Sequence, residues 1–575
     1  MSLMLSGTGV SRGIAIGKVR LLHEIQPRAV ASHIPPGTEK QEVERVTAAM
    51  HAAIAELRQL QARLRDKVPA QIMTFLDSHL LMLEDETLSQ PVIQLIEEKK
   101  YTSEWALARH RDRLVAMFEK IDDAYLRQRA EDVENVISKV LRKLDDTPAA
   151  EKESGRGYIV VTSNLAAADV LEHQHDGMRG LICSHGGTMS HAAIVARSLR
   201  IPAVTAVHPA LDLLHEADEV IVDGSSGMVV AAPDKRSLQH YRKMRRSENQ
   251  RQRDLKALAA KPARTRDRIT INLQANVDSP ADAGMARRLG AEGIGLYRSD
   301  SLFANRDDLP DEREQLAMYR RIVRAMQGRP VTLRTLDAPP AAFTADQPHH
   351  AGEAEPALGL RGIRLSLAHP ELFEPQVRAM LRASSAGPVR ILLPMVSNVT
   401  EVQLALTIIE RIRLELLHKK RTIAADIPIG ILIEVPGAAL AARQLAGHAD
   451  FFAIGSNDLT QYTLAAARED DDVQHLYDPL HPAVLRLISE VITVGEKAGK
   501  PVVLCGELGS DPRVCRLLLG LGLRHFSVQP ATLLEVKDSI RRSDVGSIKT
   551  RARRMLSSDS RARTERMLNR LIEDD

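Results

Sequence analysis

An alternation of strand-like and helix-like segments, repeated eight times after Arg268, constrains the fold of this chain more than any other feature. Each apolar or β-branched run is short and is followed by a helical stretch, so the runs can pair in parallel with helices as crossovers. Eight such units predict a closed (βα)8 barrel of the TIM type. Spacing alone leaves an open doubly wound sheet as the alternative. The runs are 269–276, 293–297, 331–336, 389–395, 429–434, 451–456, 502–507 and 525–529.

The first half of the chain shows two other patterns. Apolar residues spaced by three and four predict a helical bundle, either simply solvated or used as a docking surface for a partner protein. Its stretches are 43–68, 72–86, 104–121 and 125–144. Short β-branched runs separated by glycine-containing or helical segments then predict a small α/β unit. These runs are 158–161, 180–183, 203–206 and 219–224.

A charged segment with few apolar positions separates this half from the barrel. Its mixed signs and lack of interleaved aromatic residues favour a solvated linker helix over a phosphate-binding tract. We therefore predict a multidomain α/β protein in which a helical bundle is inserted beside a small α/β domain, followed by a linker helix and a C-terminal barrel. The expected boundaries are 1–37 with 146–232 for the α/β domain, 38–145 for the bundle, 233–268 for the linker and 269–575 for the barrel.

Length and composition agree with such a multidomain enzyme. A chain of 575 residues exceeds the size that one hydrophobic core usually supports. The 78 basic and 75 acidic residues give a net charge of only +3, which indicates neither a nucleic-acid partner nor membrane insertion. The three cysteines form no CxxC pair, so we expect a reducing, cytoplasmic location without a disulfide framework.

A histidine at the expected start of a helix is the first candidate functional residue. His191 ends the segment SHGGTMSH and precedes the helical stretch AAIVARSLR. Gly186 and Gly187 permit close approach of an anion to the backbone, and Ser190 can cap the helix. The helix dipole favours a neutral, nucleophilic imidazole and stabilises a phosphoryl group attached to it. We predict a phosphoryl-carrying His191, with His185 as the competing nucleophile and a surface histidine beside a capping turn as the alternative without function.

Polar residues also follow the expected barrel strands, where barrel enzymes place their chemistry. Glu434 and Asp458 are suitable ligands for Mg²⁺, with substrate oxygens and water completing the shell. Cys505 carries a thiol whose ordinary pKa of about 8.5 leaves it protonated at neutral pH, so it can donate a proton to a carbanion or enol. Four arginines match phosphate and carboxylate oxygens, and they are Arg298, Arg334, Arg361 and Arg364. The set predicts a site for a small phosphorylated carboxylate and a divalent metal.

Over nearly its whole length the chain resembles Enzyme I of the bacterial phosphoenolpyruvate-dependent phosphotransferase system. The resemblance rests on eight segments, of which the last two are highly specific. They are SRGIAIGK, LLMLEDE, GGTMSHAAIVARSLRIPAV, GAEGIGLYR, LGLRGIRL, LPMVSNVTEV, FFAIGSNDLTQYTLAAAR and LCGELGSDP.

This resemblance implies a function and a role for each candidate. His191 accepts the phosphoryl group of phosphoenolpyruvate and passes it to a histidine of the phosphocarrier HPr, which docks on the helical bundle; pyruvate is released in this first step of sugar uptake. His191 then has to move between the barrel and the carrier, with the linker helix as hinge. Cys505 is the implied proton donor, Glu434 and Asp458 bind Mg²⁺, and the barrel domain forms a homodimer. The implied substrate-binding residues are Arg298, Arg334, Asn457, Asp458 and Arg468.

Three departures from the family pattern leave alternatives open. Residues 338–341 read APPA where the family has a Gly-Gly-Asp-Lys turn, residues 164–168 read NLAAA where it has Asp-Leu-x-Pro-Ser, and residues 298–300 read RSD instead of RTE. A catalytically weak regulatory paralogue is therefore the alternative function. Pyruvate phosphate dikinase and phosphoenolpyruvate synthase are less favoured, because they need a large nucleotide-binding domain for which this chain has no room.

Overall fold

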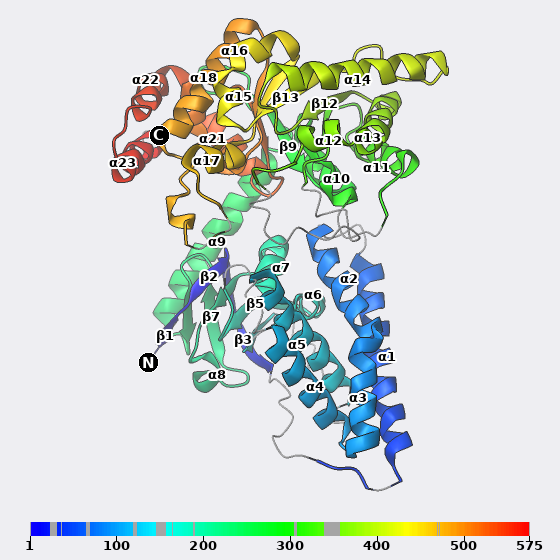
Figure 1. Cartoon of the computed structure of the whole chain (residues 1–575). Helices are drawn as coiled ribbons and strands as arrows, with labels where there is room; N and C mark the ends of the chain where they lie inside the picture. Colours follow the sequence, from blue (N-terminus) through cyan, green and yellow to red (C-terminus); the bar gives the residue numbers. More distant parts are fainter. Residues whose placement is uncertain are drawn as a thin grey trace. The chain divides into compact units, whose positions relative to one another are not determined.

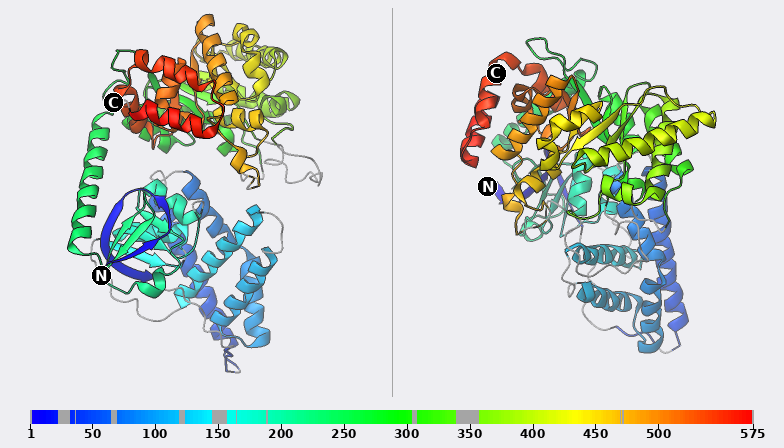
Figure 2. Two further views of the ribbon diagram at one scale, coloured as in Figure 1. Left: turned by 90° about the vertical axis from the view of Figure 1, so that its left-hand side faces the viewer. Right: turned by 45° about the horizontal axis from the view of Figure 1, so that its top comes forward.

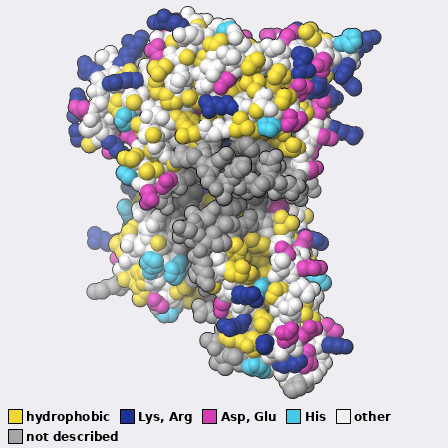
Figure 3. Space-filling view, in the orientation of Figure 1, with side chains coloured by type: hydrophobic (Ala, Val, Ile, Leu, Met, Phe, Trp, Pro, Cys, Tyr) yellow, Lys and Arg dark blue, Asp and Glu magenta, His cyan; other side chains and the backbone are white. Residues whose placement is uncertain are grey.

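The computed structural model describes residues 2–22, 32–35, 37–64, 70–118, 124–144, 157–163, 165–187, 190–303, 308–338, 357–468, 470 and 472–573. It consists of two compact units, Met1–Arg251 and Gln252–Asp575 (Figure 1). Lys, Arg, Asp and Glu side chains are interspersed on the face of both units that Figure 3 shows, in agreement with the small net charge.

Helices α1 to α5 of the first unit lie side by side and confirm the predicted bundle (Figure 1). Their apolar faces form its core, in which Leu57, Ile96 and Leu107 are inaccessible to solvent. The stretch predicted as 72–86 ends at Glu84 as α2, and α3, which was not predicted from sequence, follows it. The carboxylate of Asp85 accepts a hydrogen bond from the Thr87 N–H and so caps α3. The bounds are Glu39–Leu64 (α1), Ala70–Glu84 (α2), Glu86–Lys99 (α3), Ser103–Phe118 (α4) and Ala124–Leu144 (α5).

The α/β part of this unit is built on one sheet with the strand order β1-β8-β7-β3-β4-β5-β6-β2. Strand β3 precedes the helical bundle and pairs in parallel with β4, which follows it, so the bundle is an insertion into the sheet. The predicted strands appear as β4 to β7, whereas β1, β2, β3 and β8 were not recognised as strands from sequence. The bounds are Leu3–Ser6 (β1), Thr8–Ser11 (β2), Ile14–Leu22 (β3), Tyr158–Thr162 (β4), Met178–Cys183 (β5), Ala203–Thr205 (β6), Glu219–Asp223 (β7) and Met228–Ala231 (β8).

Three helices accompany this sheet, and their bounds are Ala167–His175 (α6), His191–Leu199 (α7) and Ala210–Leu213 (α8). A long helix, α9 (Lys235–Ala257), then crosses the boundary between the two units as one continuous element (Figure 2). It confirms the linker helix but is shorter than the predicted 233–268. The chain leaves the helix before Pro262, because proline lacks an N–H and disfavours helical geometry in the preceding residue.

The second unit contains a closed barrel of eight parallel strands, which resolves the choice between a barrel and an open sheet. The barrel closes where β16 pairs with β9, from His525 opposite Asn272 to Val528 opposite Ala275. All eight predicted runs are strands. Their bounds are Asn272–Val277 (β9), Ile294–Arg298 (β10), Val331–Arg334 (β11), Val389–Leu393 (β12), Ile429–Ile433 (β13), Phe451–Ile454 (β14), Val502–Leu504 (β15) and His525–Val528 (β16).

Helices surround this barrel, and their inner faces and the outer faces of the strands share one large core. A smaller cluster fills the barrel interior and includes Leu296, Leu392, Leu432, Phe451 and Cys505. The main helices are Pro280–Arg288 (α10), Glu312–Ala325 (α11), Ile363–Ala368 (α12), Pro370–Ala383 (α13), Val399–His418 (α14), Pro436–Leu440 (α15), Ala442–Leu445 (α16), Ser456–Leu464 (α17), Pro482–Ala498 (α18), Glu507–Ser510 (α19), Cys515–Leu521 (α20), Leu533–Arg542 (α21), Val545–Met555 (α22) and Arg561–Glu573 (α23). None of the helices in the described ranges combines the length and hydropathy that crossing a bilayer requires.

Candidate active site

The carboxyl ends of the barrel strands carry most of the candidate residues. Arg298 and Arg334 are the last residues of β10 and β11, and Glu434 and Cys505 directly follow β13 and β15. Asp458 lies in the first turn of α17, the helix after β14. Because the strands are parallel, these ends share one rim of the barrel, as expected for a barrel enzyme.

Arg334 is held at this rim by two aspartates. Its Nη1 donates to Oδ2 of Asp337 at 2.7 Å, and its Nη2 donates to Oδ2 of Asp300. The backbone N–H of Asp337 donates to Oδ1 of Asp300 at 2.9 Å, which ties the two aspartates together. Burial disfavours the charge on Arg334, but the two carboxylates raise the pKa of its guanidinium above the ordinary value. Arg334 is therefore a permanent, pre-positioned cation.

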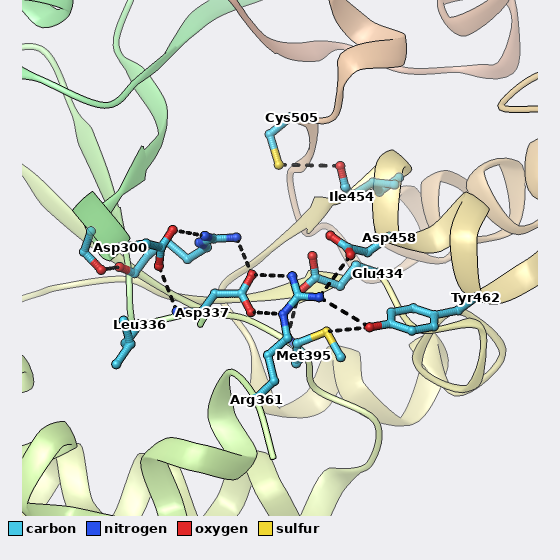
Figure 4. A network of polar contacts seen from close by, with 12 residues as sticks. Asp300, Leu336, Asp337, Arg361, Met395, Glu434, Ile454, Asp458, Tyr462 and Cys505 are labelled. Atoms are coloured by element: carbon cyan, nitrogen blue, oxygen red, sulfur yellow. Dashed lines mark hydrogen bonds and ion pairs between the residues drawn. The ribbon is translucent and has the colours of Figure 1, made fainter. Parts of the chain in front are cut away.

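Arg361 shares Asp337 with Arg334. Its Nε donates to Oδ1 of Asp337 at 2.7 Å and its Nη2 to Oδ2 at 3.1 Å. Its Nη1 reaches Oδ1 of Asp458 at 3.3 Å and the hydroxyl of Tyr462 at 3.4 Å, so the guanidinium lies between the two carboxylates (Figure 4). Burial raises the pKa of Asp337, but the two guanidiniums outweigh it and lower that pKa. We call Asp300, Arg334, Asp337 and Arg361 the arginine cluster.

Glu434 is the most deeply buried acid of the site, with 1% of its surface exposed. Its Oε1 accepts a hydrogen bond from the Met395 N–H at 2.7 Å. Burial first, and then the charges of Asp337 and Asp458, raise its pKa well above the ordinary value. Figure 4 shows the carboxyl groups of Glu434 and Asp458 near each other. A buried carboxyl group whose pKa is raised by neighbouring carboxylates fits a site for an additional cation.

The oxygen atoms at this point are suitable ligands for a divalent metal ion whose coordination shell is completed by substrate and water. Within the described ranges, no three His, Cys, Asp or Glu side chains gather into a metal-binding group. The protein therefore offers the two carboxylates of Glu434 and Asp458, whose oxygens are hard donors of the kind that Mg²⁺ prefers. Mg²⁺ commonly binds through one or two carboxylates together with substrate phosphate and water.

Cys505 is buried beneath the rim, with 2% of its surface exposed. Its S–H donates to the carbonyl of Ile454 at 3.5 Å, and its own carbonyl accepts from Nδ2 of Asn276 at 2.8 Å. Burial, with a further contribution from the Glu434 charge, raises the pKa of the thiol to about 12. The thiol is therefore protonated at neutral pH, as a proton donor has to be.

Arg298, Asn457 and Arg468 surround the site more loosely. Arg298 is exposed, and its side chain makes no hydrogen bond or ion pair with another described residue. The N–H of Glu507 donates to Oδ1 of Asn457 at 3.0 Å, and the Glu507 carboxylate lies 3.3 Å from Nη1 of Arg468. Glu507, two residues after Cys505, thus connects these two ligand-binding candidates, which belong to an earlier segment of the chain.

Arg364 pairs with a residue outside the arginine cluster. Its Nε lies 3.7 Å from Oε1 of Glu401, whose side chain also completes the capping box of α14 with Asn398. Gly362 separates it from Arg361 with a φ of +59°, a conformation that favours glycine, and the turn sends the two arginines to different partners. The sequence-based grouping of Arg364 with the site arginines therefore stays a prediction.

Helix α7 begins at His191, as predicted. The Oγ of Ser190 accepts a hydrogen bond from the Ala193 N–H at 3.3 Å and so caps the helix. In the preceding loop Gly186 has a φ of +98°, which favours glycine. The alternative, His185, is exposed and packs edge-on against His208 with ring centroids 5.6 Å apart. The side chain of His191 lies outside the described part, so its role remains a prediction at this stage.

The unusual segments are described in part. Residues 339–341 of the APPA segment and Asn164 of the NLAAA segment lie outside the described residues. Ala166 is the N-cap of α6 and provides no side-chain hydrogen bond, because alanine has no acceptor to offer.

The positions that organise the arginine cluster were not recognised from sequence. Asp337 was not singled out, Asp300 appeared only in a departure from the family pattern, and Tyr462 appeared only inside a quoted segment. Asp300 and Asp337 each lie within three residues of a strand end, so the rule that draws attention to strand ends could have identified them.

Comparisons with known proteins first define the class. Three family models match consecutive parts of the chain: the N-terminal model of PEP-utilising enzymes at residues 6–129, their mobile domain at 155–227 and their PEP-binding domain at 252–545. The chain thus has the parts of a PEP-utilising enzyme in their usual order.

Curated relatives then define the family. The phosphoenolpyruvate-protein phosphotransferase of Cupriavidus necator is 42% identical over 560 residues, which cover 94% of each chain. The proteins of the same name from Listeria monocytogenes and Haemophilus influenzae are 35% and 32% identical and cover 95% and 99% of each chain. The chain belongs to the phosphoenolpyruvate-protein phosphotransferase family, and the resemblance inferred from its motifs is confirmed.

Proposed function

We propose that this chain transfers the phosphoryl group of phosphoenolpyruvate to its own His191 and then to a histidine of an HPr-type phosphocarrier, releasing pyruvate. The observation that carries the proposal is the joint presence, at one barrel rim, of the arginine cluster, two metal-suited carboxylates and a buried thiol. The proposal is supported by the 42% sequence identity, over 94% of the chain, to an enzyme named for this reaction.

Phosphoenolpyruvate carries a phosphate and a carboxylate, and the charges of the site complement both. We assign Arg298, Arg334 and Arg468 to substrate binding, because guanidinium groups pair with such oxygens in a fixed geometry. Asn457 and Asp458 complete the proposed substrate contacts. Glu434 and Asp458 would hold Mg²⁺, which when bound neutralises charge on the transferring phosphoryl group.

The chemical step conserves atoms and protons. A nitrogen of His191 forms a bond to phosphorus while the bond from phosphorus to the enol oxygen breaks, and the electron pair remains on the leaving enolate. The enolate carbon then takes the proton of the Cys505 thiol to give pyruvate, and the thiolate regains a proton from solvent. This step requires His191 to reach the barrel rim during the reaction.

We further propose that the bundle of α1 to α5 docks the carrier, that the protein acts in the cytoplasm and that the barrel domains form a homodimer. A carrier that meets His191 has to bind beside α7, and the bundle belongs to the same compact unit as α7. The domain boundaries given in the sequence analysis remain a prediction for limited proteolysis to test.

Labelling with phosphoenolpyruvate that carries a radioactive phosphoryl group tests the proposal. The wild-type chain with Mg²⁺ is expected to gain an acid-labile phosphate, to lose it on addition of a purified HPr-type carrier and to release pyruvate. His191→Ala should show no label, whereas His185→Ala should be labelled like the wild type. Label that survives His191→Ala would exclude the assigned nucleophile, and a wild type without label would favour the weak regulatory paralogue.

A further inference from the structure

Asp337 is enclosed more completely than any other member of the arginine cluster, because its side chain is 1% exposed. It accepts three hydrogen bonds, one from Arg334 and two from Arg361. None of the roles assigned so far uses this aspartate, although Arg334 is assigned to the substrate and Arg361 touches Asp458.

We propose that Asp337 is a positioning residue that holds Arg334 and Arg361 side by side as one binding element for the phosphoryl group. The inference rests on the proposed function, which assigns Arg334 to the substrate, and it adds Arg361 to the same binding element. Asp337 itself does not touch the substrate; it acts through the two arginines that share its carboxylate.

Electrostatics explains why the shared carboxylate is needed. Two guanidiniums that bind the same carboxylate repel one another, and water does little to screen this repulsion where the groups are buried. Asp337 accepts hydrogen bonds from both guanidiniums, and Asp300 also pairs with Arg334, so that two carboxylates balance two guanidiniums. The pair can therefore exist before the substrate arrives.

The cluster also retains binding capacity for a ligand. Nε of Arg334 is buried and has no hydrogen-bond partner, which is costly unless a ligand supplies one. The contacts of Arg361 with Asp458 and Tyr462 are long, at 3.3 and 3.4 Å, and can be exchanged for an anionic oxygen. Both arginines thus keep N–H groups for a phosphoryl group while Asp337 fixes their positions.

Asp337 has a second consequence, for Asp458. It binds Arg361 at 2.7 and 3.1 Å, closer than the 3.3 Å between Arg361 and Asp458. Without the charge of Asp337, the nearest carboxylate left to Arg361 is that of Asp458, a proposed metal ligand. Loss of Asp337 should therefore also weaken Mg²⁺ binding to the free enzyme.

The test compares Asp337→Asn with a matched control in the full-length protein. Asparagine keeps the shape but presents an N–H to one guanidinium. We expect the KM for phosphoenolpyruvate to rise about tenfold to a hundredfold with a smaller change in kcat, as for the loss of a charged hydrogen bond. Mn²⁺ affinity without substrate, measured by electron paramagnetic resonance, should fall.

Glu312→Gln is the control, because Glu312 also joins two arginines, Arg378 and Arg382, but on the outer helices. The KM of this control variant should stay within about twofold of the wild-type value.

A double-mutant cycle with Arg361→Gln decides whether Asp337 acts through Arg361. Arg361→Gln alone should raise the KM, and the double variant should be no worse than Asp337→Asn, because the two changes remove one interaction. A wild-type KM in Asp337→Asn, or fully additive effects, would overturn the inference. If Asp337→Asn does not fold, as its melting curve would show, an unchanged KM in Arg361→Gln overturns it instead. A wild type that phosphoenolpyruvate does not label would refute the proposed function and not this inference alone.

Discussion

The two units use buried ion pairs in different places. In the barrel unit, the arginine cluster lies at the strand ends, where the proposed substrate binds. In the first unit, partly buried ion pairs join the bundle helix α5 to α1 and to α6 of the α/β part. Helix α7 of this unit begins with a serine cap at the proposed phosphoryl carrier. The residues of these pairs are Glu56, Lys139, Arg142 and Asp169.

This difference separates two uses of buried charge. The barrel maintains costly charges at a site that has to recognise an anion and a metal, so its charges are arranged before the ligand arrives. The first unit uses charges to hold its two parts together. Variants of matched residues in the two units can test this distinction.

The largest effect is expected for Glu434→Gln. Removal of this carboxylate should lower the rate of His191 labelling about a thousandfold. The raised pKa of Glu434 means that its charged form destabilises the fold at every pH above its ordinary pKa of about 4.3, so the variant should melt at a higher temperature at pH 7 without metal. Glu292→Gln is the control, since burial raises the pKa of this acid too, but it precedes β10 at the other end of the barrel. Equal labelling rates in both variants would remove Glu434 from the site.

Asp169→Asn should affect stability instead of chemistry. Both oxygens of the buried Asp169 accept from Nη2 of the partly exposed Arg142 at 2.9 Å, and loss of a hydrogen bond to a charged group costs about 2 kcal/mol. The lowered pKa of Asp169 stabilises the fold at neutral pH, and this contribution disappears as the pH falls through about 4 and below. Urea unfolding should therefore separate variant and wild type at pH 7, and the difference should shrink near pH 3. A variant that is labelled far more slowly at 25 °C would contradict the structural role.

Cys505→Ala should lower the rate of pyruvate release about a hundredfold, the usual size of one proton-transfer contribution. Cys515→Ala is a close control, because this cysteine is also buried and burial raises its pKa to about 12 as well, but it lies on α20. Enzyme-coupled detection of pyruvate measures both variants. Similar rates for the two variants would mean that another group protonates the enolate.

The smallest effect is expected for Ser190→Ala. Loss of an N-cap costs about 1 kcal/mol, so the melting temperature should fall slightly. Ser279 caps α10 of the barrel unit in the same way, by accepting from the Asp282 N–H at 3.2 Å. Ser279→Ala should cost a similar amount of stability, but only Ser190→Ala should also change the hydrolysis rate of the phosphorylated enzyme, because only α7 carries the proposed phosphohistidine at its start. Identical hydrolysis rates would show that the cap does not influence His191.

The barrel strands were predictable because each forms a compact run of apolar and β-branched residues between helical stretches, as in 429–434. Strands β1 to β3 were missed because their runs are short or interrupted by glycine, as at Gly7 and Gly13. Their places in the sheet depend on partners more than 100 residues away, such as Tyr158 opposite Lys18. The pairing of Arg364 with Glu401 was unpredictable for a similar reason, since Glu401 belongs to another helix.

The sequence by itself determined the local features of this protein: the helical periods, the eight strand runs, the cap before His191 and the chemical types available at the strand ends. Tertiary structure decided which of those groups share a partner. One carboxylate, Asp337, meets the guanidinium of nearby Arg334 and that of Arg361 from a later segment, and Glu434 acquires its raised pKa from burial and from carboxylates that follow other strands. Periodicity and capping depend on neighbours a few residues away, whereas charge pairing depends on distances that only the closed barrel sets.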